Sequence, residues 1–263
     1  MPLGRYVTLL PSLIQAMSSD RIDVGTLRLW IPGSRVIRAS VLAGNVRLRG
    51  IIDAVVTPGD TVVDVGANIG AIAAYAATRV GPTGRVLAIE PADDNLAVLR
   101  ENLRANHLDQ VTVIAGACGR SRESREFYLR GDLSAVNSLF PESCYAEVTA
   151  VSQVEVTPRD DLVEGTVALV KIDVEGAELD VLAGMPRLLR QPGLRLVIEW
   201  HPRLQQAAGY EPDALPKMLM AEGFTLKAAG HLRTSSLTAR RLPEAAERLM
   251  RSGHPVELLC TKP

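Results

Sequence analysis

Glycine and acidic residues in the first half of the chain have the spacing of a nucleoside-binding site. The segment VVDVGANIG, residues 62–70, is an apolar strand that ends in a turn framed by Gly66 and Gly70. Glycine at such a turn lets a ligand approach the backbone closely. The helix expected after it offers free N–H groups and a positive dipole end. Glu90 ends the next apolar run, where its carboxylate can accept hydrogen bonds from both hydroxyls of a ribose.

Two classes of cofactor use this layout. Dinucleotide enzymes need G-x-G-x-x-G, because the pyrophosphate lies on the start of the helix. Here the pattern is D-x-G-x-N-x-G, with Asp64 before the turn and Asn68 inside it. Asp64 would repel a pyrophosphate but suits the ammonium group of a methionine moiety. The residues therefore favour S-adenosyl-L-methionine over NAD, with a nicotinamide oxidoreductase as the alternative.

The third apolar run ends in AGACG, where backbone groups of Ala117 can read an adenine ring. We therefore expect the cofactor to be bound by Asp64, Gly66, Ala67, Asn68, Gly70, Glu90, Pro91 and Ala117.

A second group of chemically capable residues lies in VALVKIDVEGAELDVL, residues 167–182. Side chains alternate along a strand, so Lys171 and Asp173 point to the same face. A lysine inside an apolar strand is costly unless it is paired. Asp173 is the natural partner, with Glu175 as a second one. The simplest alternative is a structural ion pair that orders the end of the strand.

The following apolar run, LRLVIEWHP, carries Glu199 and His201 on one face by the same alternation. Ligands of open α/β sheets bind at the carboxyl ends of the strands, so these side chains are expected to gather near a reacting group. Glu199 and His201 could instead bind Mg²⁺ or another hard cation together with Asp173, and the cation would lower the pKa of an acceptor. We favour a site without a metal. His201 could also be a strand-end histidine bonded to backbone.

Elements that would position these residues are visible in the hydrophobic pattern. From residue 61, short apolar runs alternate with helical patterns, which predicts βαβ units and a doubly wound, mostly parallel α/β sheet. Residues 120–165 break this alternation and predict a hairpin or lid inserted at the carboxyl edge of the sheet, with Asn137 and Ser138 near the cofactor or the acceptor. We expect an N-terminal extension of helix, strand and helix over residues 1–57 and the main domain over 58–263.

Composition narrows the class of protein. The formal net charge of −1 over 263 residues gives no electrostatic footprint for a polyanion, which disfavours nucleic acid as a partner. No apolar stretch is long enough to span a bilayer. The cysteines, Cys118, Cys144 and Cys260, lack metal or disulfide spacing and predict a reducing cytoplasm. The apolar N-terminal segment is expected to be an amphipathic helix that docks on the domain or forms a homodimer contact.

Several of these motifs together resemble the FkbM family of methyltransferases. The resemblance covers roughly residues 58–203 and rests on VVDVGANIG, the acidic strand end AIEP, the NSL triplet, TPRDDL, LVKIDVEGAELDVLAG and LVIEWHP. It implies a class I, Rossmann-like methyltransferase fold with a seven-stranded sheet whose last strand is antiparallel. It also implies O-methylation of a hydroxyl on a polyketide, sugar or other specialised metabolite. Arg159 stands where the family has Leu, and residues 1–57 and 232–252 match poorly.

The expected reaction is an in-line transfer of a methyl group to a small-molecule acceptor. A hydroxyl nucleophile must lose its proton, and His201 is the first choice of base because its unperturbed pKa lies near neutrality. Glu199 would orient His201 or replace it, while Asp173 and Lys171 would hold the acceptor. N-methylation and a non-catalytic binding module remain as alternatives.

Overall fold

The computed structural model describes residues 10–16, 18–131, 136–142, 147–229 and 234–262. Cys144 and the first nine residues of the expected N-terminal helix therefore lie outside the described residues. The chain forms two compact units, Met1–Ala115 and Gly116–Pro263, each with its own alternation of strands and helices.

The first unit begins with the N-terminal extension and continues into three strands that alternate with helices. Its elements are α2 (Leu10–Ala16), β1 (Arg21–Val24), β2 (Leu27–Trp30), α3 (Arg35–Val55), β3 (Thr61–Val65), α4 (Ala71–Val80), β4 (Arg85–Glu90), α5 (Asp93–Ala105) and β5 (Val111–Ala115).

Strands β3, β4 and β5 are parallel and adjacent in that order. Val62 and Val63 on β3 and Val86 on β4 are fully buried, and helix α4 packs against both strands. The register places Asp64 opposite Ala88 and Glu90 opposite Ala115. The predicted βαβ pattern is confirmed in this unit, and it brings the carboxyl ends of β3 and β4 to the same edge.

The N-terminal extension contains one strand more than predicted. β1 pairs antiparallel with β2 to form a hairpin between helices α2 and α3. Helix α2 docks on this hairpin: the Ser12 hydroxyl donates to the Asp23 carbonyl, and the Gln15 side chain accepts from the Asp23 amide at 2.9 Å. The helix thus packs within the N-terminal extension, and the expected docking on the main domain or a partner stays a prediction. None of the described helices has the length and apolar character needed to cross a membrane.

The second unit starts with the insertion and ends with an antiparallel strand. Its elements are β6 (Ala117–Cys118), β7 (Glu123–Leu129), β8 (Ala150–Thr157), η2 (Arg159–Asp161), β9 (Leu169–Ile172), α6 (Glu178–Ala183), α7 (Pro186–Leu189), β10 (Arg195–Trp200), α8 (Pro202–Ala207), α9 (Ala214–Ala221), β11 (Thr225–Ala229), β12 (Thr234–Leu237), η3 (Ala239–Arg241), α10 (Leu242–Ser252) and β13 (Val256–Thr261).

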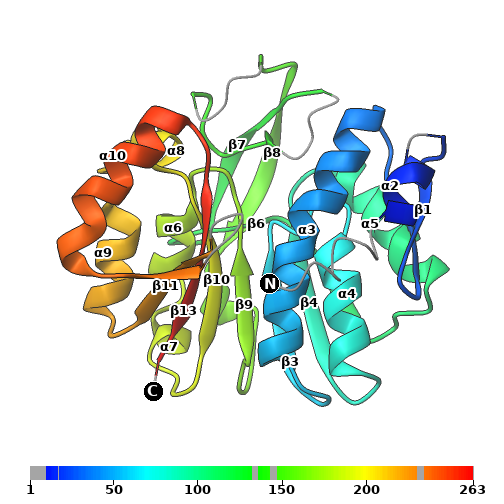
Figure 1. The fold of residues 1–263 in the computed structure, drawn as a ribbon, viewed down its shortest axis with the longest axis horizontal. Coiled ribbons are helices and arrows are strands. Elements are labelled where there is room, and N and C mark those ends of the chain that lie inside the picture. The colour runs from blue at the N-terminus through cyan, green and yellow to red at the C-terminus, as the bar shows by residue number, and fades with distance from the viewer. Residues whose placement is uncertain (1–9, 17, 132–135, 143–146, 230–233, 263) are drawn as a thin grey trace. The chain divides into compact units, whose positions relative to one another are not determined.

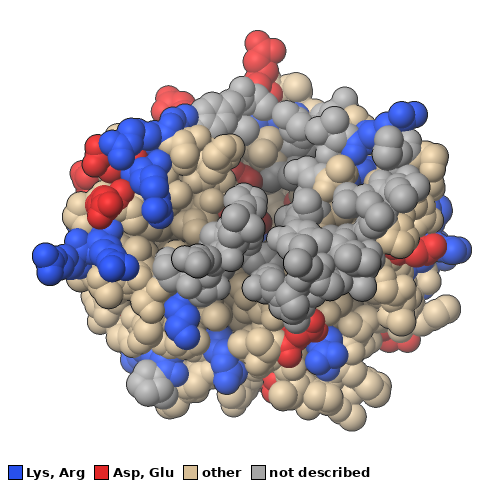
Figure 2. All heavy atoms as spheres, in the orientation of Figure 1, with Lys and Arg blue, Asp and Glu red and all other residues tan. Residues whose placement is uncertain are grey.

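Five strands of this unit lie in the order β12-β11-β13-β10-β9. β9 and β10 are parallel, and the final strand β13 runs antiparallel between β10 and β11 (Figure 1), as the family resemblance implies. β12 is an additional edge strand in a part of the chain that the resemblance does not cover. It leads into α10, which buries Leu242 and Leu249; red and blue side chains are mixed over this helix in Figure 2.

Residues 120–165 form the predicted hairpin. β7 and β8 are long antiparallel partners (Figure 1), and β6 adds a short parallel strand on the other side of β8. The Ser138 hydroxyl donates to the carbonyl of Glu175 at 2.8 Å. The insertion therefore reaches the turn that follows β9, which confirms the prediction that it lies over the carboxyl end of that strand.

In the first unit, Asn102 on α5 joins the N-terminal hairpin to the turn after β3. Its Nδ2 donates to the carbonyls of Trp30 at 3.0 Å and Ile69 at 2.9 Å, and its Oδ1 accepts from the Trp30 amide. The side chain is 1% exposed. Unmet hydrogen-bonding groups at this depth are costly, so the amide stabilises both the hairpin and the turn.

We predict that Asn102→Ala lowers the free energy of unfolding by about 1–3 kcal/mol, because buried backbone groups lose their partners. The matched control is Asn106→Ala: Asn106 makes the same pair of bonds to Arg28, but at an exposed site. Urea unfolding followed by circular dichroism measures both. Equal losses for the two variants would contradict the role given to Asn102.

Candidate functional site

The turn after β3 has the backbone geometry that its glycines predict. Gly66, Asn68 and Gly70 have φ of 75°, 50° and 79°, a region that glycine adopts without strain and asparagine tolerates. A Cβ atom added at Gly70 would lie 2.9 Å from the Leu99 side chain, so glycine is also required for packing against α5. The chain can turn directly into α4, whose N-terminus is suited to bind an anionic group.

Glu90 is held at the end of β4 by three donors. Its Oε2 accepts from the Asn68 amide at 2.8 Å, and its Oε1 accepts from the Ala92 amide and from Asn95 Nδ2, both at 3.0 Å. The carboxylate therefore couples β4 to the turn and has a fixed orientation. Sequence reasoning missed Asn95; the available signal was a polar residue on the buried face of α5.

The other residues predicted to bind the cofactor lie on the same two strand ends, except for one. The amides of Gly66 and Ala67 both donate to the Ile89 carbonyl at 3.0 Å, which ties the turn to β4. Asp64 is fully buried in β3, and Pro91 directly follows Glu90. Ala117 lies in the second unit, in strand β6. Contacts of Asp64, Pro91 and Ala117 with a cofactor stay predictions.

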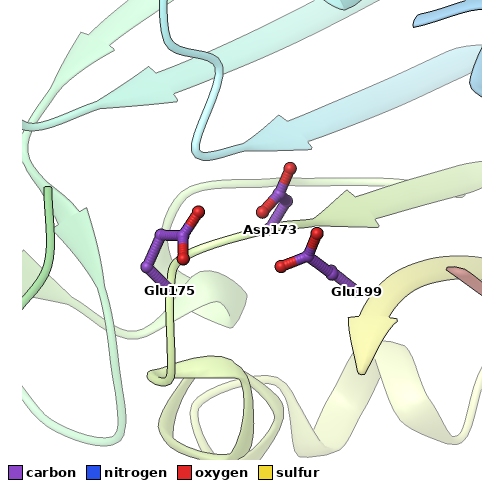
Figure 3. A group of neighbouring side chains, drawn as sticks. All are labelled: Asp173, Glu175 and Glu199. Carbon is purple, nitrogen blue, oxygen red and sulfur yellow. The ribbon is translucent and has the colours of Figure 1, made fainter. Parts of the chain in front are cut away.

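In the second unit, three acidic side chains converge where β9 and β10 end. Asp173 directly follows β9, Glu175 lies in the next turn, and Glu199 is near the end of β10. Each offers a carboxylate oxygen within 4.8 Å of the others, and the three point toward one another in Figure 3. We call them the carboxylate trio. Carboxylate oxygens at this spacing can share protons or hold a hard divalent cation.

Burial and mutual repulsion set the proton affinity of the trio. Burial, followed by the charge of Asp173, raises the pKa of Glu175 and of Glu199 well above the ordinary range. Glu257, directly opposite Glu199 on β13, acts in the same direction. Lys171 opposes this effect: its buried ammonium lies 3.7 Å from Asp173, which confirms the predicted ion pair.

β10 ends at Trp200, and no hydrogen bond joins Glu199 to His201 among the described residues, so the expected cooperation of these two side chains stays a prediction. His201 is the N-cap of α8, and its buried ring lies near Gly253 and Arg203 rather than in the trio. Burial is the main cause that lowers its pKa, and within the described residues its Nδ1 has no hydrogen-bond partner. Glu175 takes the place expected for His201, including in the predicted metal set.

Sequence reasoning considered Glu175 only as a partner of Lys171. The sequence does not show that the Glu175 backbone is left-handed, with φ of 54°, so the place of its side chain could not be predicted. Figure 3 shows the Glu175 side chain directed toward Asp173 and Glu199.

These pKa shifts predict how stability depends on pH. A carboxyl group whose pKa is raised by folding stabilises the folded state most below its ordinary value of 4.5, and this contribution is lost as pH rises through the raised value. We expect the free energy of unfolding to fall as the pH rises above 4.5 and through the raised pKa values, by up to about 1.4 kcal/mol per pH unit for each such group. Glu199→Gln should make this slope shallower.

Urea unfolding at a series of pH values measures the slope. Glu155→Gln, at an exposed position on β8, is the control and should keep the wild-type slope. An unchanged slope in Glu199→Gln would show that Glu199 is ionised in the folded protein across this range.

The comparisons with known proteins agree with this geometry. A family model described as the methyltransferase FkbM domain matches residues 64–226, which is more than half of the chain. Hexuronic acid methyltransferase AglP of Haloferax volcanii is 32% identical over 164 residues, covering 61% of both chains. AMB antimetabolite synthetase AmbE of Pseudomonas aeruginosa is 30% identical over 217 residues, covering 65% of this chain.

The chain spans 10% of the length of AmbE and 61% of the length of AglP. The crystal structure of a candidate rRNA methylase from Clostridium thermocellum has a TM-score of 0.50 and 14% identity, covering 82% of this chain and 93% of that chain. This similarity shows the fold alone, and the fold is the class I, Rossmann-like α/β fold. Taken with the match over residues 64–226, it means that the chain belongs to the FkbM family of S-adenosylmethionine-dependent methyltransferases.

Proposed function

We propose that the protein transfers the methyl group of S-adenosyl-L-methionine to a hydroxyl of a small-molecule acceptor. The observation that carries the proposal is the carboxylate trio, which gathers proton-accepting groups beside Lys171. Two relatives support the class of acceptor. One acts on a hexuronic acid and one is a synthetase of an antimetabolite, so sugars and specialised metabolites are the first acceptors to test.

The residues of the first unit fit this cofactor. Gly66 and Gly70 place no side chain at the two ends of the turn after β3, and Glu90 accepts from the Asn68 amide, the Ala92 amide and Asn95 at the end of β4, where ribose hydroxyls can donate to it. Asp64 is proposed to attract the methionine ammonium, and the backbone near Pro91 and Ala117 to border the adenosine. When bound, the cofactor supplies a methyl group on a positively charged sulfur.

The residues of the second unit are proposed to prepare the acceptor. Aligning an acceptor with the methyl carbon can lower the barrier by about 7–11 kcal/mol. The acceptor oxygen gains the methyl group and loses its proton, which passes to a carboxylate oxygen of Glu199 or Glu175. A raised pKa suits either group to this role, because a base works best near the operating pH. Lys171 and Asp173 hold the acceptor, and His201 is the alternative base.

The charge of the trio bears on the type of acceptor. Three carboxylates repel a carboxylate at the reacting position, so a uronic acid would present a hydroxyl rather than its acid group. A protonated amine would be attracted, but it would have to lose a proton before it could react. This favours a hydroxyl and keeps an amine as the alternative.

A divalent cation is the second candidate for the role of the trio. Oxygen ligands from three carboxylates suit Mg²⁺ or a similar hard ion, which would lower the pKa of the acceptor hydroxyl. The two mechanisms differ in one observable: only the metal-assisted reaction is abolished by a chelator and restored by added cation.

The cofactor proposal predicts that Glu90→Ala weakens binding of S-adenosylhomocysteine by about 1.5–3 kcal/mol, because hydrogen bonds to a charged group are lost. Isothermal titration calorimetry measures this on the folded variant. Glu101→Ala, on helix α5, serves as the control, since Glu101 pairs only with surface arginines among the described residues. Wild-type affinity in Glu90→Ala would mean that the ribose is held elsewhere.

The acceptor proposal predicts that Glu199→Gln lowers turnover by about 10²–10⁴-fold while its affinity for S-adenosylhomocysteine stays near that of the wild type. The assay is release of S-adenosylhomocysteine with a panel of uronic acids and sugars, with and without chelator. His201→Ala tests the alternative base in parallel. Full turnover in Glu199→Gln, together with loss in His201→Ala, would reverse the two roles.

A further inference from the structure

The carboxyl group of Glu178 is a buried titratable group that the proposed chemistry does not use. It lies at the first position of α6 and is 2% exposed. Its Oε1 accepts hydrogen bonds from the amides of Val174 at 3.2 Å and Gly176 at 3.1 Å. These two amides flank Glu175, so Glu178 holds the backbone on both sides of a member of the carboxylate trio.

The backbone at Glu175 needs such support. Its φ of 54° is left-handed, which costs about 1–2 kcal/mol for a residue with a Cβ atom. A conformation of this kind persists only where the surrounding structure holds it. From the opposite side, the Ser138 hydroxyl donates to the Glu175 carbonyl at 2.8 Å and accepts from the Phe140 amide at 3.1 Å. The insertion thus contributes the second half of the support.

Helix α8 closes the third side of this turn. Gln205, which is fully buried, donates from Nε2 to Glu178 Oε2. Gly176 has φ of 108°, and a Cβ atom there would lie 3.1 Å from the Leu204 carbonyl. Only glycine therefore allows the turn to pack this closely against α8, and Gln205 fixes the carboxyl group that shapes the turn.

We propose that Glu178 and Ser138 are positioning residues that together fix the Glu175 backbone so that its carboxylate joins Asp173 and Glu199. The functional value of this arrangement rests on the proposed methyl transfer, but the arrangement itself does not. In the stretch from Asp173 to Glu178, the first two acids then belong to the trio and the third folds the turn that presents them.

Two variants at Glu178 separate the effect of losing the carboxylate charge from the effect of losing the hydrogen-bond acceptor. Glu178→Gln keeps an oxygen that can accept from the Val174 and Gly176 amides, whereas Glu178→Leu removes it at similar volume. Asp180→Asn, on the same helix, is the control, because the Asp180 carboxylate pairs with Tyr210 and Arg120 and, among the described residues, makes no hydrogen bond or ion pair to the turn. The full chain is used throughout, without acceptor or cofactor.

Hydrogen exchange read by mass spectrometry on peptides that contain Gly176 is the first readout. We expect exchange of this amide to rise about 10- to 100-fold in Glu178→Leu, the value of a lost hydrogen bond to a charged group. Exchange in Glu178→Gln and Asp180→Asn should stay within a few-fold of the wild type. Equal exchange in all four proteins would overturn the proposal.

The second readout reports on the Glu175 carboxyl group itself. In protein labelled with ¹³C at the glutamate side-chain carboxyl, the Glu175 signal is assigned by its loss in Glu175→Gln and titrated by NMR. We expect its titration midpoint to move toward that of an ordinary glutamate in Glu178→Leu and in Ser138→Ala, and to stay in Glu178→Gln. An unmoved midpoint in folded Glu178→Leu would overturn the proposal.

Ser138→Ala carries the test if Glu178→Leu does not fold. A protein that passes both readouts but transfers no methyl group to any acceptor would retain these positioning roles and lose the proposed function, so the two failures are distinguishable.

Discussion

The structure depends on one constraint: a buried carboxylate must be given hydrogen-bond donors, since an uncompensated buried charge is costly. Glu90 receives two backbone amides and Asn95, and Glu178 receives two backbone amides and Gln205. In both cases at least one of the amides, Asn68 or Gly176, belongs to a turn with left-handed residues. The acid and the turn therefore stabilise each other, and the same bonds that satisfy the charge shape the loop that can bind a ligand.

The carboxylate trio meets this constraint in a different way. Glu175 and Glu199 lie near Asp173 with one buried lysine, so their charges are only partly balanced, and protons remain bound to higher pH. Such a cluster costs stability at neutral pH, which is common where groups are arranged for chemistry rather than for folding. The repulsion can be relieved by a proton from an acceptor or by a cation, and these are the two mechanisms considered for the protein.

Most of the central strands and the turn after β3 could be predicted from the sequence, because apolar runs and glycine-framed turns are local signals. β3, β4, β9 and β10 are continuous apolar segments, and alternation along β9 correctly paired Lys171 with Asp173. The same rule left His201 undecided, because His201 is also the N-cap of α8 and its ring lies near Gly253 and Arg203. β1 and β12 are strands of only four residues, on a hairpin and at a sheet edge, and such short segments give little periodicity to detect.

Residues whose role depends on tertiary contacts were the ones missed. Glu178 reads as an ordinary acidic residue in the first turn of a helix, and only the folded turn shows that it accepts from Val174 and Gly176. Asn95 and Gln205 are buried amides that sequence alone does not distinguish from surface ones. The NSL triplet is recognisable as a sequence motif, but its structural role follows only from the hydrogen bond that the Ser138 hydroxyl donates to the Glu175 carbonyl.

A crystal structure of the protein with S-adenosylhomocysteine tests the central claim most directly. The account predicts that the ligand lies along the turn of residues 66–70, with its ribose hydroxyls within hydrogen-bond distance of the Glu90 carboxylate. Electron density for the ligand at any other place, or a turn that stays without ligand at saturating concentration, would contradict it.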